Sequence, residues 1–297
     1  MDRRVLTGLL LGLAAAVIGG AWQVVTRHST TTSIAAPDLA ILRYAIPALL
    51  LLPLSLRIGL IPRGAARGPL ALLVLGAGLP FGVVAMSGSQ FAPAAHMGVL
   101  MAGASPLMAA ALSWALWRER PGGWRLIGLA LMALGVLLLG AHSLASMSSQ
   151  TWRGDLLFLL AALLWALFTL AFRHARLTPW QAAAVVNSWS ALLLLPWLIW
   201  RGGGHLLEAP AHDLLFQAVW QGLIAGLLGL WTFSGAIVRL GASRAAAFGA
   251  LTPAISALGG WWWLGDVLTP LNGAAVLAAM LGVALASGAI DAPSLKR

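Results

Sequence analysis

The pattern of hydrophobic and polar positions divides the chain into ten apolar runs of about 20 residues, joined by short polar connections. An α-helix needs about 20 residues to cross roughly 30 Å of hydrocarbon, so each run has the length of a transmembrane helix. Only the connections at 143–152 and 202–212 are at all extended, which leaves no room for a soluble catalytic domain. The pattern therefore predicts an all-α integral membrane protein with ten transmembrane helices. The runs are Val5–Thr26, Pro37–Leu56, Gly68–Ser87, Ala92–Trp117, Trp124–Ala141, Asp155–Phe172, Pro179–Trp200, Asp213–Val238, Ser243–Leu264 and Leu268–Ala286.

Two stretches, 94–136 and 241–283, repeat one plan at an offset of 147 residues: an apolar run with a central Pro, a charged turn and a second apolar run. A second echo relates 8–28 to 154–174 at an offset of 146. Self-similarity at a fixed period indicates that one structural unit is used twice. We therefore expect two five-helix units, residues 1–145 and 146–297. The matched landmarks are Pro106 with Pro253, Trp114 with Trp261, Glu119 with Asp266, Gly135 with Gly282, and Arg27-His28 with Arg173-His174.

Composition supports a membrane protein, because 60% of the residues are hydrophobic and only 9% are charged. There is no Cys, which excludes disulfides and thiolate chemistry. No metalloprotease motif, phosphate-binding glycine loop or intramembrane carboxylate pair occurs, so we expect neither an enzyme nor a cofactor or metal. The first run follows Arg3-Arg4 and resembles a secretory signal, but its copy lies mid-chain, so we interpret both as retained helices.

The distribution of the eighteen Lys and Arg residues predicts the orientation. Fourteen lie on the side of the N-terminus, three (Arg27, Arg153 and Arg201) lie on the other side, and Arg43 falls within a run. By the positive-inside rule both termini are cytoplasmic, and the net charge of +10 needs no nucleic-acid partner. Since five helices are an odd number, the second unit must be inverted relative to the first.

An inverted 5+5 repeat is typical of carriers that work by alternating access, in which two similar halves open a shared site to either side in turn. The alternative is that duplication produced only a larger helix bundle, or a receptor. Transport is the interpretation that gives the inversion a use.

On the two five-helix units, the mid-run Pro106 and Pro253, the acidic residues that follow them and the Gly-Val pairs at 135 and 282, the chain resembles the EamA-type members of the drug/metabolite transporter superfamily. Within that superfamily it resembles the bacterial exporters of aromatic amino acids. The resemblance implies that helices one to four of each unit line the path and that the fifth and tenth stand outside. The chain departs from the family in the opening helix of each unit. Family members often carry a Trp-Gly pair there, whereas this chain has Gly19-Gly20 in the first unit and Trp165-Ala166 in the second.

Ionisable groups in hydrocarbon are costly and indicate function. Arg43, beside Tyr44, is the only cation well inside a run, and His96 lies about one turn into its run. All eight acidic residues fall at run ends or in connections, so we predict no buried carboxylate and no obligatory proton exchange. Arg43 is then free to bind a substrate carboxylate through its planar guanidinium. The alternative is that Arg43 extends to water near Asp38 and binds nothing.

Polar and aromatic residues in mid-run complete the predicted substrate site, although each polar one could instead bind a neighbouring helix. Pro106 and Pro253 are expected to kink their helices and serve gating. We therefore expect an inner-membrane exporter, working as a monomer in the lipid bilayer, of amino acids, above all those with aromatic or large apolar side chains, and of related small metabolites. The alternative is an exporter of other metabolites or drugs. The candidate substrate-binding residues are Trp22, Gln23, Arg43, Tyr44, His96, Met101, Ser105, Trp165, Thr169, Asn187, Trp231, Phe248 and Thr252.

Overall fold

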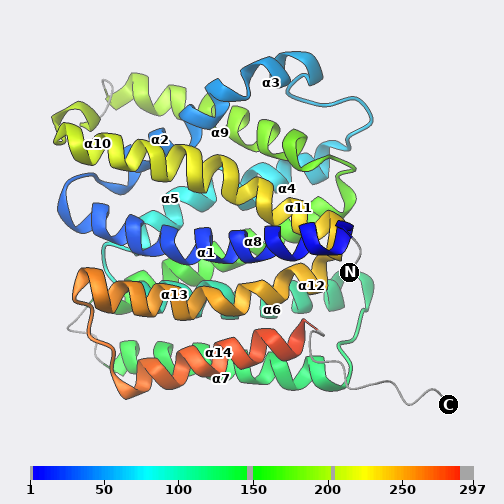
Figure 1. Ribbon diagram of the computed structural model, residues 1–297, viewed down its shortest axis with the longest axis vertical. Coiled ribbons are helices and arrows are strands. Elements are labelled where there is room, and N and C mark those ends of the chain that lie inside the picture. Colours follow the sequence, from blue (N-terminus) through cyan, green and yellow to red (C-terminus); the bar gives the residue numbers. More distant parts are fainter. Residues whose placement is uncertain (1–2, 146–149, 202–204, 288–297) are drawn as a thin grey trace.

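The computed structural model describes residues 3–145, 150–201 and 205–287, and within these ranges it consists of helices and short connections without a strand (Figure 1). The predicted unit boundary at 145/146 and the last two basic residues of the chain border on or lie outside these ranges. The helices are α1 (Arg3–Thr32), α2 (Ala36–Leu50), α3 (Leu52–Ile58), α4 (Arg67–Ala77), α5 (Leu79–Gly88), α6 (Ala94–Trp117), α7 (Gly123–Ala145), α8 (Thr151–His174), α9 (Pro179–Arg201), η2 (Leu206–Glu208), α10 (Ala211–Gln217), η3 (Ala218–Gly229), α11 (Leu230–Leu240), α12 (Ala242–Ala247), η4 (Phe248–Leu251), α13 (Thr252–Gly259), η5 (Gly260–Leu264) and α14 (Pro270–Ala286).

The predicted all-helical membrane fold is confirmed. Among the described residues, seven helical segments are long and apolar enough to cross a membrane, and α2 with α3, bent by 65°, would form an eighth. The helical segment 242–264 and the apolar helix α14 occupy the last two predicted runs. This arrangement is compatible with ten spans in a multi-pass membrane protein.

The two units run in opposite directions, which follows from the contacts at the helix ends. Arg27, near the end of α1, donates hydrogen bonds beside the start of α6, and His96 at the start of α6 contacts Asp155 in the first turns of α8. Thus α8 begins at the end of the bundle where α1 finishes. We call the end that holds the start of α1 the N-terminal end, at the right in Figure 1, and the other the opposite end.

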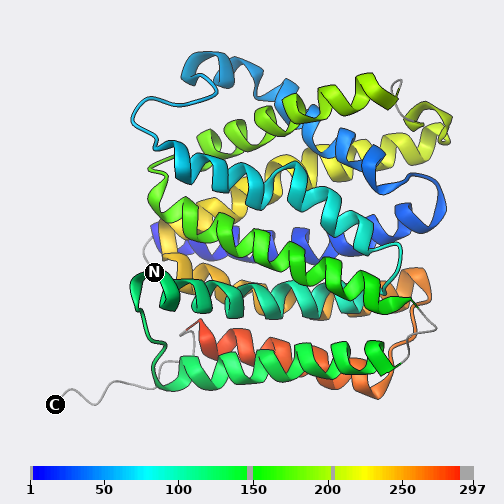
Figure 2. The same cartoon turned by 180° about the vertical axis from the view of Figure 1, so that it is seen from behind.

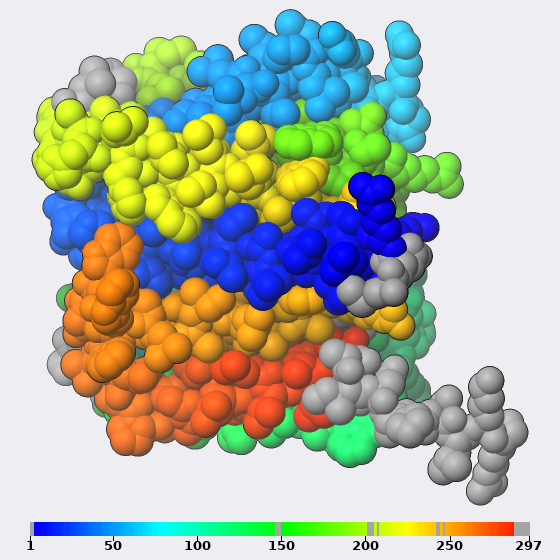
Figure 3. Space-filling view, viewed as in Figure 1, coloured from blue at the N-terminus to red at the C-terminus, as the bar shows by residue number. Residues whose placement is uncertain are grey.

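The helices form two layers. On the face shown in Figures 1 and 3, α1 lies in the middle, between α11 on one side and α13 and α14 on the other. Figure 2 shows α4, α5, α8, α6 and α7 on the other face. The fifth helix of each unit, α7 and α14, packs against its counterpart at one edge. A side chain on Gly128 would meet the backbone of Gly282, and the reverse also holds, so these two glycines allow the close approach.

A break between α4 and α5 positions one wall of the molecule. Pro80 cannot donate to the helix, and the chain is interrupted at Gly78. The Tyr44 hydroxyl donates to the Gly78 carbonyl, and the Leu79 amide donates to Ser190 Oγ over 2.9 Å. The polar backbone groups that the break releases are therefore satisfied by side chains of α2 and α9.

Large apolar side chains cover the outside of the bundle, as expected for a surface in contact with lipid. Several exposed Trp side chains lie near the helix ends. Trp117 and Trp124 are at the N-terminal end, and Trp261, Trp262 and Trp263 are at the opposite end. Trp rings favour the interface between hydrocarbon and water, so these positions fit an interfacial belt.

Candidate functional site

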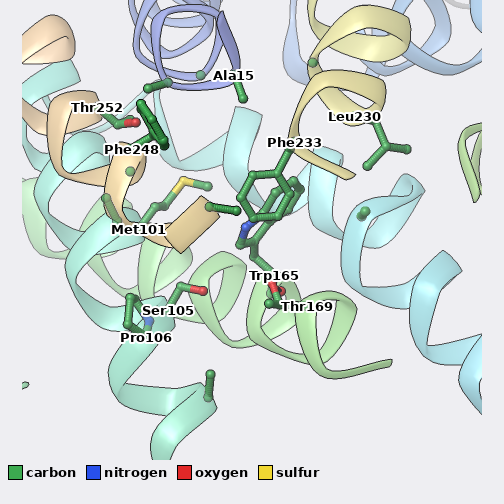
Figure 4. Close-up of a pocket in the computed structure, with 18 of the residues that line it drawn as sticks. Ala15, Met101, Ser105, Pro106, Trp165, Thr169, Leu230, Phe233, Phe248 and Thr252 are labelled. Atoms are coloured by element: carbon green, nitrogen blue, oxygen red, sulfur yellow. Dashed lines mark hydrogen bonds between the residues drawn. The ribbon is translucent and has the colours of Figure 1, made fainter. Parts of the chain in front are cut away.

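A cavity of about 510 Å³ lies between the two units and receives residues from both (Figure 4). Its deeper part is lined by Trp22, Gln23 and Arg43. Its other end reaches Glu119 and Arg173, which are exposed at the N-terminal end of the bundle. The cavity is therefore accessible from the N-terminal end.

Most of the side chains that the sequence predicted for a substrate site lie along this cavity. Figure 4 shows Met101 of α6 close to Phe248 of the second unit, with Thr252 beside Phe248 and Ser105 farther along α6, next to Pro106. These four residues are two pairs of repeat counterparts, so the two units contribute matching positions. The predicted residues that line the cavity are Trp22, Gln23, Arg43, Tyr44, Met101, Ser105, Pro106, Trp165, Thr169, Asn187, Phe248 and Thr252.

His96 does not line the cavity. Its Nδ1 lies 2.9 Å from Asp155 Oδ1, and both residues are more than nine-tenths buried where α6 packs on α8. The expectation that acidic residues stay out of the protein interior is wrong for Asp155 and for Asp38, which is 7% exposed. Both lie at helix ends, as the sequence indicated, but neighbouring helices cover those ends.

Two further predicted residues lie elsewhere. Trp231 stacks on Trp180 of α9, with ring centroids 5.2 Å apart, and is not among the cavity residues. Pro253 is buried at the start of α13, where its carbonyl accepts a hydrogen bond from Ser256 Oγ, and its backbone lies close to Gly98 of α6. Of the two predicted prolines, only Pro106 lines the cavity.

Arg43 is 8% exposed, and its guanidinium carbon lies 4.5 Å from the centre of the Trp22 ring. A cation over an indole face at this distance is favourable. Its Nε and Nη1 atoms have no hydrogen-bond partner among the described residues. No ion pair joins Arg43 to Asp38 among the described residues. Arg43 therefore borders the cavity while two of its donor atoms are enclosed by the protein and unpaired.

Aromatic rings form a continuous wall beside Arg43. Phe81 lies 6.0 Å from Trp22 and 5.2 Å from Trp165, and Trp165 lies 5.4 Å from Phe233, measured between ring centroids. Trp165 and Phe233 face each other in Figure 4. Sequence reasoning missed Phe81 and Phe233, because a Phe in an apolar run looks the same whether it faces lipid or a cavity.

The polar residues of the cavity differ in how far the protein already satisfies them. Thr169 donates to the Trp165 carbonyl and Asn187 to the Ala183 carbonyl, both within their own helices. Gln23, in contrast, has a buried Oε1 atom with no partner among the described residues. Trp22 donates to Gln221 of the π-helix η3 over 2.8 Å, and Gln221 itself does not line the cavity.

The fifth helix of each unit contributes more than the resemblance implied. Both α7 and α14 stand at one edge of the bundle in Figure 1. Leu129 of α7 and Val283 of α14 nevertheless line the cavity, together with Arg125 near its mouth. The expectation that these helices stand wholly outside the path is therefore wrong at the N-terminal end.

Comparisons with known proteins agree with this architecture. The EamA-like transporter family matches residues 6–141 and 152–288. The chain is 32% identical over its full length to the "Uncharacterized protein PA1977" of Pseudomonas aeruginosa, covering 97% of that protein. It is 29% identical over 193 residues, 64% of each chain, to the "Uncharacterized transporter YwfM" of Bacillus subtilis. A solved structure titled "Crystal structure of protein" shares the fold, with a TM-score of 0.59 at 20% identity over 98% of both chains. The chain belongs to the EamA-like transporter family and is a membrane transporter of small molecules, not an enzyme.

Proposed function

We propose that this transporter exports amino acids with aromatic or large apolar side chains by alternating access. The observation that carries the proposal is Arg43, a buried cation in the cavity whose Nε and Nη1 atoms have no partner. Leaving buried donors on a charged group unpaired is costly, so a ligand that accepts from them gains affinity. A carboxylate matches the two-pronged geometry of a guanidinium.

The rest of a zwitterion also finds complementary groups. The partnerless Gln23 Oε1 is an acceptor for an ammonium group. Phe81, Trp165 and Phe233 offer an apolar, aromatic surface for the side chain. Glu119 is the acidic residue of the cavity lining, and it lies at the mouth, so no lining carboxylate competes with the substrate for Arg43.

The cavity volume of about 510 Å³ lies within the roughly 300–1,000 Å³ of sites for small molecules. The basic residues near the N-terminal end favour placing that end in the cytoplasm of a cell with this protein in its inner membrane. In that orientation the cavity opens to the cytoplasm, the side from which an exporter loads. We further propose a monomer as the working unit, because one chain supplies both units of the inverted repeat.

The test is a flux panel with purified protein in liposomes. We expect labelled tryptophan and phenylalanine to move faster than alanine, and faster than tryptamine and phenethylamine, which lack the carboxylate. Each flux should be measured with and without a pH gradient and against empty liposomes. Equal flux of amines and amino acids would contradict carboxylate recognition and favour an exporter of other metabolites or drugs.

A further inference from the structure

An ion pair closes the opposite end of the bundle. Arg27, one turn beyond the last cavity residue of α1, places its Nε 3.1 Å from Asp266 Oδ1. Its Nη1 donates to the carbonyls of Ser89 and Ala92, over 2.9 and 2.8 Å. Asp266 Oδ2 accepts from the amide of Ala94 over 3.0 Å. One pair of side chains thereby joins α1, the start of α6 and the end of η5.

The sequence repeat gives each member of this pair a counterpart at the N-terminal end. Arg27 corresponds to Arg173 at an offset of 146, and Asp266 corresponds to Glu119 at an offset of 147. Arg173 and Glu119 both line the mouth of the cavity and are exposed. Within the described ranges neither has a hydrogen bond or an ion pair. The Arg–carboxylate ion pair is therefore formed at the opposite end, and its counterpart at the N-terminal end is not formed.

The neighbouring rings show that the two side chains start from nearby helices. His174, next to Arg173, lies 5.4 Å from the Trp117 ring, two residues before Glu119. At the closed end the corresponding His28 stacks on Trp263 at 4.8 Å. The aromatic contact therefore exists at both ends, and only the Arg–carboxylate contact differs.

We propose that Arg173 and Glu119 form the ion pair that closes the N-terminal end, while Arg27 and Asp266 separate to open the opposite end. The proposal rests on the alternating access of the proposed function, in which the two units exchange conformations. Arg27 binds carbonyls of residues 89–92, which lie just before the repeated stretch 94–136. The end of α11 lies in the same place before the repeated stretch 241–283, so in the exchanged state Arg173 donates to carbonyls there. It makes Glu119 and Arg173 positioning residues that set which side the cavity faces.

The test measures which side of the membrane reaches the cavity, and it needs no substrate. The chain has no Cys, so Ala102→Cys in the cavity lining provides a single thiol. An impermeant thiol reagent is applied from the side of the N-terminal end or from the other side. Glu119→Gln and Arg173→Gln should each lower labelling from the opposite end several-fold, and Arg27→Gln should raise it. The exchange Glu119→Arg with Arg173→Glu should restore labelling, whereas Arg57→Gln, an exposed control at the N-terminal end, should leave it unchanged.

A cross-link gives a second, independent measurement. Glu119→Cys with Arg173→Cys should form a disulfide on oxidation, abolish labelling of Ala102→Cys from the N-terminal side and retain it from the other. A reductant should break the disulfide and restore labelling from the N-terminal side. Unchanged labelling in Glu119→Gln and Arg173→Gln, or a cross-linked protein that is still labelled from the N-terminal side, would overturn the proposal. If the labelling shifts as expected but no amino acid is carried, the gate stands and only the substrate assignment fails.

Discussion

Replacing Arg43 with Gln tests the proposed substrate site most directly, because it removes the charge and both partnerless donors and leaves a shorter, neutral polar side chain. A hydrogen bond to a charged group is worth about 1.5–3 kcal/mol. Its loss corresponds to about a ten- to hundredfold weaker affinity for an amino acid. Arg43 is 8% exposed, so little solvent screens the interaction and the upper part of that range is expected. Arg43→Lys should recover part of the affinity, since it keeps the charge but loses the fork.

The assay compares each amino acid with its decarboxylated amine in liposomes that contain wild type, Arg43→Gln or Arg43→Lys. The amine has no carboxylate to lose, so its flux should stay unchanged or rise when the buried cation is removed. Arg57→Gln, exposed in the last turn of α3, is the matched control and should behave as wild type. Thermal unfolding of each variant shows whether folding is intact.

Two results would refute the reasoning. An equal loss of flux for the acid and the amine would mean that Arg43 supports the structure, for example through its contact with Trp22. An unchanged KM for the acid would mean that the guanidinium does not touch the carboxylate. In either case Arg43 would not be a substrate-binding residue, and the aromatic residues of the cavity alone would have to account for substrate binding.

Three further predictions concern specificity, topology and packing. Phe233→Ala should weaken aromatic substrates about two- to tenfold relative to leucine in competition assays, from a loss of about 0.5–1.5 kcal/mol, whereas Trp231→Ala on the same helix should not change this selectivity. Reporter fusions after Arg67 and Gln90 should report the cytoplasm and the outside, respectively, and a same-side result would contradict the orientation. Asp155→Asn should lower the melting temperature, because it weakens a buried pair with His96, but should leave KM unchanged because the pair lies outside the cavity; a large change in KM would connect the pair to transport.

The all-helical fold and the apolar runs of spanning length were readable from the sequence because the bilayer fixes how many residues a span needs. Gln23 and Thr169 were found because polar groups in mid-span are costly in lipid and turn inward. The choice of Trp231 over Phe233 shows the limit. Two residues apart on a helix, they face nearly opposite sides, and apolar residues surround both. The π-helix η3, just before α11, also shifts the phase of the span, and no single residue signals it.

The burial of Asp155 was missed for a different reason. Hydropathy places it correctly near the start of a helix but says nothing about the helices around that start. Gly154 lies against Gly88 and Ala92, and this close approach covers the carboxylate. Small residues at the contact were visible in the sequence, but which helices they join depends on the three-dimensional arrangement.

The charges at the two ends of the bundle recur between the units, whereas the charge in the middle does not. Arg27 has Arg173 as its counterpart, but the residue at the same offset from Arg43 is Trp189. If the contact at each end forms in only one of the two states, both units must carry equivalent residues at their ends. A substrate site that is used in both states needs no equivalent in the other unit. In the proposed mechanism one unit therefore holds the carboxylate throughout, and only the ends alternate. Arg43→Gln should then weaken binding measured from either side of the membrane, and Arg173→Gln should alter it from one side alone.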